Sequence, residues 1–135
     1  GYAGLADWES IARSAVFAHQ NQTLLLGNGD VQNRLQALEL CRRFGADGAL
    51  IGRFALGSPW IFGDNLPSPQ DRFSAMLLHA QYFKQCFPSR RLDSLRRHFL
   101  SYVSGLKTAK QLRSQIVTIS DFDQLLSLEP AILNC

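Results

Sequence analysis

The sequence predicts an α/β segment followed by a small all-α domain. Short apolar runs at 23–26 and 49–51 each end in a polar turn that contains glycine, as strands of a covered parallel sheet do. Between them, apolar side chains recur at helical spacing over residues 33–44. A strand, helix and strand of these lengths fit a parallel crossover. From residue 67 onward, amphipathic patterns of helical period predict a helical bundle.

The expected elements of the first half have identifiable ends. Asp7 is placed to cap a helix that reaches about His19, and a cation is favoured near a helix C-terminus. We therefore expect no catalytic role for His19. Gly45 follows the crossover helix at the position where a left-handed residue ends many helices. Pro59 can open a short helix at its first position.

A linker separates the two halves. Residues 63–69 combine a glycine, two prolines and polar side chains, so we place the boundary between domains 1–66 and 67–135 there. Ser68 and Pro69 then predict a helix start. The expected helices of the second half cover 69–87, 92–104, 106–117 and 122–128, and the first of them has Phe73, Met76, Leu77, Ala80, Tyr82 and Phe83 on its buried side.

The two polar turns carry the chemistry of the first half. The turn at 27–30 has two glycines, which let the backbone approach a ligand, beside the polar groups of Asn28 and Asp30. The second turn combines backbone amides at Gly52 with the Arg53 guanidinium, a seat for an anion or phosphate. Both turns follow strand ends, where α/β proteins bind ligands. A phosphate-bearing ligand is one interpretation, and an ordinary turn with a surface arginine is the other.

Composition limits the classes of protein. The 135 residues suit one domain or two small ones. Cys41, Cys86 and Cys135 are odd in number and lack metal-like spacing, so we expect neither a disulfide framework nor a metal site. The sequence has no apolar run of 18 residues, and its first residues do not resemble a signal peptide, so we expect no membrane span and a cytoplasmic setting.

Positive charge is concentrated in one segment. Residues 90–113 hold seven cations against the single carboxylate Asp93, a net charge of +6, whereas residues 1–89 are neutral. Such a patch attracts nucleic-acid phosphates. The alternative is an ordinary solvated helix face. The candidate RNA-binding side chains are Arg90, Arg91, Arg96, Arg97, His98, Lys107, Lys110 and Arg113.

Several motifs give the chain a family resemblance. They are GYAGLADW at 1–8, GNGDV at 27–31, GADGALIGR at 45–53, ALGSPWIF at 55–62 and RRHFLSY at 96–102. In order and spacing the chain resembles the tRNA-dihydrouridine synthases over almost its whole length. The resemblance implies an α/β fold, the C-terminal portion of a (β/α)8 TIM barrel, followed by that family's small all-α helical domain. A complete barrel needs about 200 residues or more, so we expect the chain to hold only a part.

The resemblance also implies an activity. Enzymes of the family this chain resembles are flavin-dependent. In them FMN, after its reduction by NADPH, reduces the C5–C6 bond of a uridine in tRNA. By this resemblance Asn28, Gly29 and Asp30 contact FMN, and Gly52 with Arg53 holds its phosphate. The helical domain helps to grip tRNA, here through backbone and shape, because the sequence lacks an aromatic stacking motif.

The family's proton donor is a cysteine in an Asn-x-Gly-Cys-Pro context, which none of the three cysteines has. We therefore expect no catalytic residue in this chain and no activity from it alone. A partial barrel also leaves a sheet edge and an apolar interior open, so we expect a complementing barrel piece, self-association or a poorly ordered barrel half.

Two other functions compete with this one. The chain can be a stand-alone RNA-binding or docking module with a barrel remnant as scaffold. It can also belong to another flavin barrel enzyme that acts on a small molecule, although the helical domain with its Arg96–His98 motif argues against that.

Overall fold

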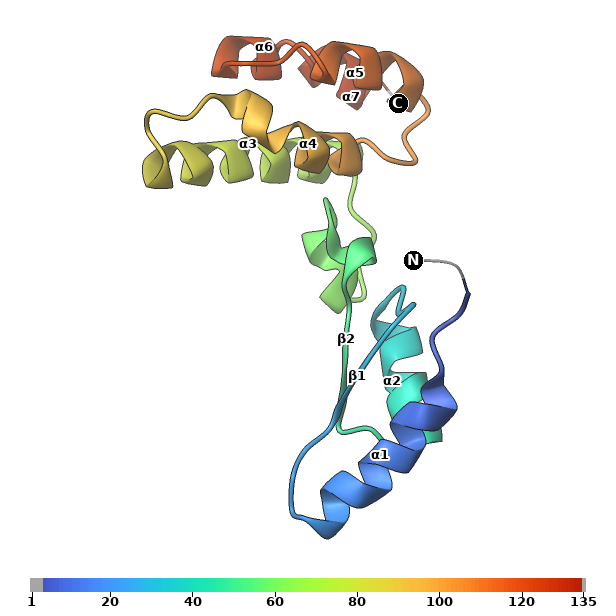
Figure 1. Cartoon of the computed structure of the whole chain (residues 1–135). Helices are drawn as coiled ribbons and strands as arrows, with labels where there is room; N and C mark the ends of the chain where they lie inside the picture. Colours follow the sequence, from blue (N-terminus) through green and yellow to red (C-terminus); the bar gives the residue numbers. More distant parts are fainter. Residues whose placement is uncertain (1–3, 135) are drawn as a thin grey trace. The chain divides into compact units, whose positions relative to one another are not determined.

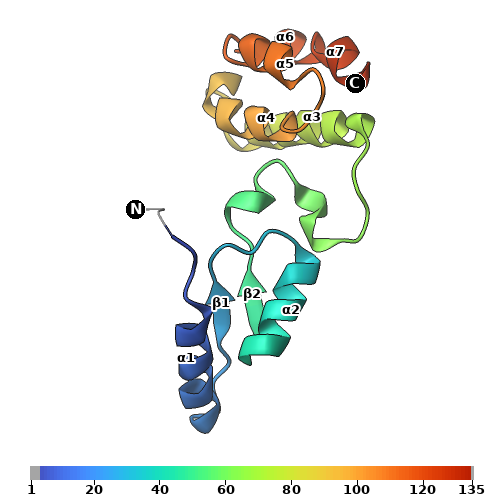
Figure 2. The same cartoon turned by 90° about the vertical axis from the view of Figure 1, so that its right-hand side faces the viewer.

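The computed structural model describes residues 4–134, which form two compact units (Figure 1, Figure 2). The first, here called the strand unit, extends to Ala55 and includes Ile61–Asp64. The second, the helical unit, comprises Leu56–Trp60 and the chain from Asn65 onward. The two units interleave close to the boundary expected at residue 66. Cys135 and the first three residues of the motif at 1–8 lie outside the described residues.

Two parallel strands joined by a helix form the centre of the strand unit. β1 (Leu26–Asn28) pairs with β2 (Gly48–Leu50), and α2 (Arg34–Phe44) is the crossover between them. α1 (Trp8–Gln20) precedes the first strand. The predicted strand–helix–strand order with parallel pairing is confirmed.

The first strand begins later than the sequence predicts. Residues 23–26 are the expected strand, but the N–H of Thr23 donates to the carbonyl of Ala18 at 3.0 Å. The chain is therefore still leaving α1 at Thr23, and its ladder hydrogen bonds start only afterwards. As a result Asn28, expected in the turn, is the last residue of β1.

The two faces of the strand pair differ. Side chains alternate along a strand, so Gly27 and Ala49 share the face that α1 and α2 cover. The Trp8 ring packs there, and a Cβ on Gly27 would lie 2.5 Å from it. Leu26 and Leu50 lie on the opposite face and are 58% and 49% exposed. The strand unit thus has one covered face and one open apolar face.

Local hydrogen bonds set the helix ends of this unit. The Asp7 carboxylate accepts from the Ser10 N–H at 3.0 Å, which confirms Asp7 as the cap of α1. Asn33 caps α2 in the same way by accepting from the Gln36 N–H at 2.9 Å. Gly45 ends α2 in the left-handed conformation, with φ of 70°. That conformation favours glycine, as predicted.

The longest helix described in the helical unit begins with side-chain caps. Ser68 and Asp71 form a reciprocal capping box at the start of α3 (Pro69–Cys86). A short 3-10 helix, η1 (Arg53–Ala55), and a second, η2 (Pro59–Phe62), precede it. The later elements are η3 (Leu92–Leu95), α4 (Arg96–Tyr102), α5 (Ala109–Ile116), α6 (Phe122–Leu126) and α7 (Glu129–Leu133).

Two expectations for this unit are wrong. The helix predicted over 92–104 is split into η3 and α4, while Leu92 and Leu95, three residues apart, are both buried as predicted. Tyr82 was assigned to the buried side of α3 but is 57% exposed. The buried stripe passes through Phe73, Met76 and Ala80, and Tyr82 lies too close in sequence to Ala80 to share it.

One large core holds the helical unit together. Its buried side chains come from α3 through α7: Phe73, Met76, Ala80, Leu92, Leu95, Phe99, Tyr102, Val103, Leu112, Ile116, Ile119, Leu125, Leu128 and Ile132. The segment at 56–60 joins this unit because Gly57, with φ of 67°, packs its backbone on Ser101 and Tyr102, where a Cβ would lie 2.5 Å away. Within residues 4–134, no helix is long and apolar enough to cross a membrane.

Candidate cofactor and RNA sites

The two polar turns of the strand unit meet at one cavity. Its volume is about 290 Å³, and it is open to solvent. All five candidate cofactor residues line it, together with three apolar neighbours: Asn28, Gly29, Asp30, Val31, Leu50, Gly52, Arg53 and Phe54. Parallel pairing of β1 and β2 places both C-terminal ends at the same edge, which is why turns 23 residues apart share a cavity.

Asp30 and Arg53 form an ion pair across this cavity. Arg53 Nη2 lies 2.8 Å from Asp30 Oδ1, and the second carboxylate oxygen of Asp30 accepts from the N–H of Ala6 at 2.7 Å. Asp30 therefore orients the guanidinium and ties it to the N-terminal segment. This pairing was not predicted from the sequence. The sequence does contain a signal for this ion pair, namely residues of opposite charge just after the ends of two adjacent parallel strands.

Gly29 lets the N-terminal segment pack on the turn. Its φ is 137°, and a Cβ there would lie 2.3 Å from the Cβ of Ala6. The Gly29 carbonyl accepts from Trp8 Nε1 at 3.1 Å, which holds the turn from the same side. Asp30, the next residue, has φ of 55°, a conformation that Asp tolerates better than most residues. The glycine expected to admit a ligand thus accommodates the chain itself.

The other residues that line the cavity offer groups suited to a phosphate. A Cβ on Gly52 would meet no atom within 4 Å, so an incoming group can approach the backbone there. The Arg53 guanidinium and the exposed Asn28 side chain flank the same cavity. These donors suit a phosphate dianion. Within residues 4–134, no cluster of three or more His, Cys, Asp or Glu side chains could hold a metal ion.

The candidate RNA-binding residues lie on three consecutive stretches of the helical unit. Arg90 and Arg91 precede η3, and α4 begins at Arg96. The remaining candidates follow on α4 and on or just before α5: Arg97, His98, Lys107, Lys110 and Arg113. Arg96 and His98 are half-buried, and the other six side chains are exposed.

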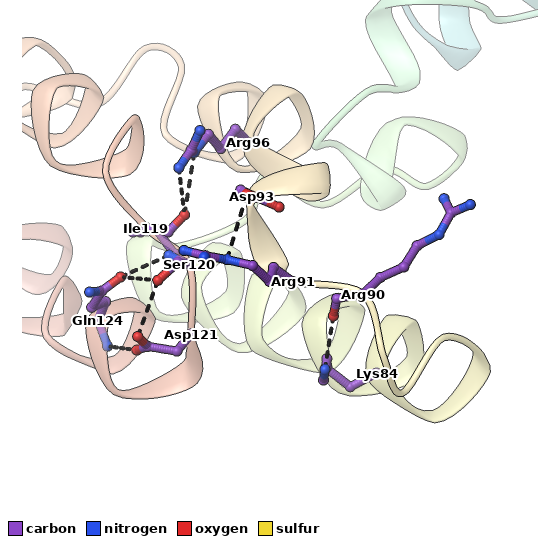
Figure 3. Close-up of polar contacts among 9 residues, drawn as sticks. All are labelled: Lys84, Arg90, Arg91, Asp93, Arg96, Ile119, Ser120, Asp121 and Gln124. Carbon is purple, nitrogen blue, oxygen red and sulfur yellow. Dashed lines mark hydrogen bonds and ion pairs between the residues drawn. The ribbon is translucent and has the colours of Figure 1, made fainter.

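Arg96 faces inward and its neighbour Arg97 faces solvent. Figure 3 shows the Arg96 guanidinium directed at the backbone carbonyl of Ile119, to which Nε and Nη2 donate at 3.3 and 3.2 Å. The bond ties α4 to the segment before α6. The Arg97 side chain is exposed. The structure thus separates two arginines that the sequence treats alike.

His98 packs against a second histidine, His79, which was not among the predicted site residues. Its ring lies 5.1 Å from that of His79, edge to face, and His79 Nδ1 lies 3.4 Å from the Tyr102 hydroxyl. Burial, and then the neighbouring His98, lowers the pKa of His79, while burial raises the pKa of Tyr102. His98 therefore contributes to the packing of α3 against α4 as well as to the surface.

Comparison with known proteins identifies the family. Residues 1–134 match the family model described as dihydrouridine synthase (Dus). The chain belongs to the dihydrouridine synthase family. It is 31% identical over 140 residues to a probable tRNA-dihydrouridine synthase of Mycobacterium tuberculosis, a match that covers 92% of this chain and 34% of the relative. A Staphylococcus epidermidis protein with the same description is 34% identical over 119 residues, covering 83% of this chain and 36% of the relative.

The resemblance seen in the sequence motifs is therefore confirmed at the level of the family. The chain spans about a third of the length of these curated relatives. Membership in the dihydrouridine synthase family also argues against a flavin barrel enzyme of another family.

Proposed function

We propose that the chain supplies the phosphate end of an FMN site, and an RNA-gripping domain, to a tRNA-dihydrouridine synthase. FMN, when bound and reduced by NADPH, supplies hydride for the C5–C6 bond of a uridine in tRNA. The observation that supports this proposal is the single cavity lined by both strand-end turns in a chain of this family. A cytoplasmic setting stays a prediction from composition.

Each candidate cofactor residue has a proposed role at this cavity. Gly52 offers backbone amides and Arg53 a guanidinium to the phosphate. Asn28 offers an amide side chain to the flavin. Gly29 shapes the turn, and Asp30 orients Arg53 through their 2.8 Å ion pair. None of these groups is a proton donor for the uridine, so we propose that this donor comes from another part of the enzyme.

The open face of the strand pair supports a barrel. Leu26 and Leu50 are exposed on the face that a (β/α)8 barrel would enclose, whereas the other face has its helices. We propose that further barrel strands cover these side chains and complete the flavin wall. The chain by itself is then expected neither to hold FMN nor to oxidise NADPH.

The proposed RNA grip is the exposed basic surface of the helical unit. Its members carry positive charge within one segment whose only carboxylate is Asp93: Arg90, Arg91, Arg97, Lys107, Lys110 and Arg113. Arg96 and His98 are half-buried, and we propose that they support this surface through their packing. Contacts of this kind bind phosphates and do not read sequence.

Flavin titration of the protein with its barrel completed tests the phosphate seat. Arg53→Ala removes a charge-assisted contact to a dianion and should weaken FMN binding by about 10- to 150-fold. Arg34→Ala is the matched control, since Arg34 also pairs with a carboxylate, Asp64 at 2.6 Å, but does not line the cavity. Unchanged FMN affinity in Arg53→Ala would rule out the assignment.

A second candidate function is an RNA-binding module that acts without flavin chemistry. The observation in its favour is the complete apolar core of the helical unit. A mobility-shift series with a tRNA transcript at several salt concentrations tests the grip that both functions share. If four or five cations meet phosphates, log K should fall with log salt at a slope of about −3 to −4. FMN binding by the completed protein then decides between the two functions.

A further inference from the structure

The turn between α3 and η3 is held by a lysine that lies outside the candidate RNA-binding set. Lys84, in the last turn of α3, donates from Nζ to the carbonyls of Pro88 and Arg90, the latter at 2.8 Å. The N–H of Arg90 donates to the Phe87 carbonyl at 3.1 Å, which closes the turn. The ammonium is therefore engaged with backbone carbonyls of residues that follow Lys84 in the chain.

This turn presents two arginines and an aromatic ring to solvent. The Arg90 guanidinium lies over the Phe87 ring, 5.3 Å from its centroid, and Phe87 packs on Phe83 at 5.4 Å. Figure 3 shows the Arg90 side chain extending away from Lys84, on the other side of the turn. Arg91 is exposed, with its Nε 3.8 Å from Asp93. Stacking on a ring preorients a guanidinium and lowers the entropic cost of binding.

We propose that residues 87–91 contact a phosphodiester backbone through Arg90 and Arg91, and that Lys84 is the positioning residue of this contact. Two features separate Lys84 from the arginines. Its side chain is half-buried, while theirs are exposed. Its ammonium donates to main-chain carbonyls, whereas the Arg90 guanidinium stacks on the Phe87 ring and Arg91 Nε lies beside Asp93. This inference rests on the proposed RNA function and adds to it a residue that acts without touching RNA.

A double-mutant cycle with the full chain and an unmodified tRNA transcript tests the proposal. Lys84→Met should weaken binding by roughly 3- to 10-fold at fixed salt, the size expected of residues that act together. With Arg90→Ala and Arg91→Ala already present, Lys84→Met should have no further effect, because the contact it positions is gone. With Lys110→Ala present, it should keep its full effect. Lys84→Arg should retain binding, since a guanidinium can also donate to two carbonyls.

The other outcomes have separate meanings. Additive losses for Lys84→Met and the arginine pair would show that Lys84 contacts RNA directly and would overturn the proposal. Unchanged tRNA affinity in a folded Lys84→Met variant would show a role in stability alone and would also overturn it. Circular dichroism checks the fold of each variant, and Lys84→Gln replaces Lys84→Met if the latter does not fold. Failure of the unsubstituted chain to bind tRNA would instead refute the proposed RNA function itself.

Discussion

The strand unit and the helical unit differ in how far each encloses its own apolar side chains. The buried cluster of the strand unit contains Trp8, Val31 and Ala46, while Leu26 and Leu50 stay exposed. The helical unit buries side chains from α3 through α7 in one core. Because apolar burial is the main favourable term in folding, the helical unit has its own source of stability, whereas the strand unit leaves exposed the apolar side chains that further barrel strands are proposed to cover.

The two units also use their cations differently. In the strand unit, Arg53 and Arg34 form ion pairs with Asp30 and Asp64. In the helical unit, Arg72, Lys84 and Arg96 donate to backbone carbonyls, and the remaining basic side chains of the 90–113 segment are exposed. The strand unit holds five arginines against six carboxylates, a net charge of −1, whereas the helical unit holds nine lysines and arginines against five carboxylates, a net charge of +4. This difference favours the proposed cofactor chemistry in the strand unit and the proposed nucleic-acid attraction in the helical unit.

The largest expected effect is on the core of the helical unit. Phe99 is fully buried, so Phe99→Ala should lower the free energy of unfolding by about 3–5 kcal/mol. Phe17 on α1 is 70% exposed, and Phe17→Ala should change it by no more than about 0.5 kcal/mol. Thermal and urea unfolding followed by circular dichroism measures both. Equal losses would contradict the difference in enclosure between the units.

Next in size is the effect of adding a side chain at Gly29, in the turn that follows β1. Gly29→Ala adds a Cβ at a left-handed φ and against Ala6, and should destabilise the strand unit by about 1–3 kcal/mol. Gly52→Ala is the control, since a Cβ there meets nothing within 4 Å. Urea unfolding of both variants tests this, and a Gly29→Ala protein as stable as Gly52→Ala would show that the turn tolerates a side chain.

A smaller effect separates the neighbouring arginines of α4. Arg96→Ala removes the bonds to Ile119 and should cost about 1 kcal/mol of stability, while Arg97→Ala should cost less than about 0.5 kcal/mol. For RNA the order reverses: Arg97→Ala should flatten the salt slope of tRNA binding by about one unit. Arg96→Ala should leave that slope unchanged. A flattened slope in Arg96→Ala would place its guanidinium on RNA.

The smallest effects are on the pH dependence of stability. Bonds from Ser68 hold the pKa of Asp71 below its ordinary value of 3.8, and bonds from Leu25 and then His19 do the same for Asp47. A lowered folded pKa stabilises the protein above about pH 4, and this contribution is lost as pH falls through the folded pKa. Asp71→Asn should therefore reduce the acid sensitivity of the helical unit, and Asp47→Asn that of the strand unit. Unfolding midpoints measured between pH 6 and 2 test both predictions. If the midpoint of a variant depends on pH as that of the unsubstituted chain does, its carboxylate is not a source of the acid sensitivity.

The sequence by itself determined the features that depend on neighbouring residues. Asp7 and Ser68 cap helices through bonds to residues three positions away, and Gly45 ends a helix through its own φ. The parallel pairing followed from two apolar runs separated by one helix. These outcomes are predictable because each physical cause lies within a few residues of its effect.

Only the tertiary structure decided which polar groups serve the fold and which face outward. Asp30 pairs with Arg53, and Arg96 with the carbonyl of Ile119, each across 23 residues of sequence. A glycine is needed at position 29 because Ala6, which is distant in sequence, packs where a Cβ would lie. A guanidinium bonds equally well to a carboxylate, a carbonyl or a phosphate, so its residue type alone does not fix its partner. The partner is set by which groups folding brings within about 3 Å, and that distance is a property of the packed chain.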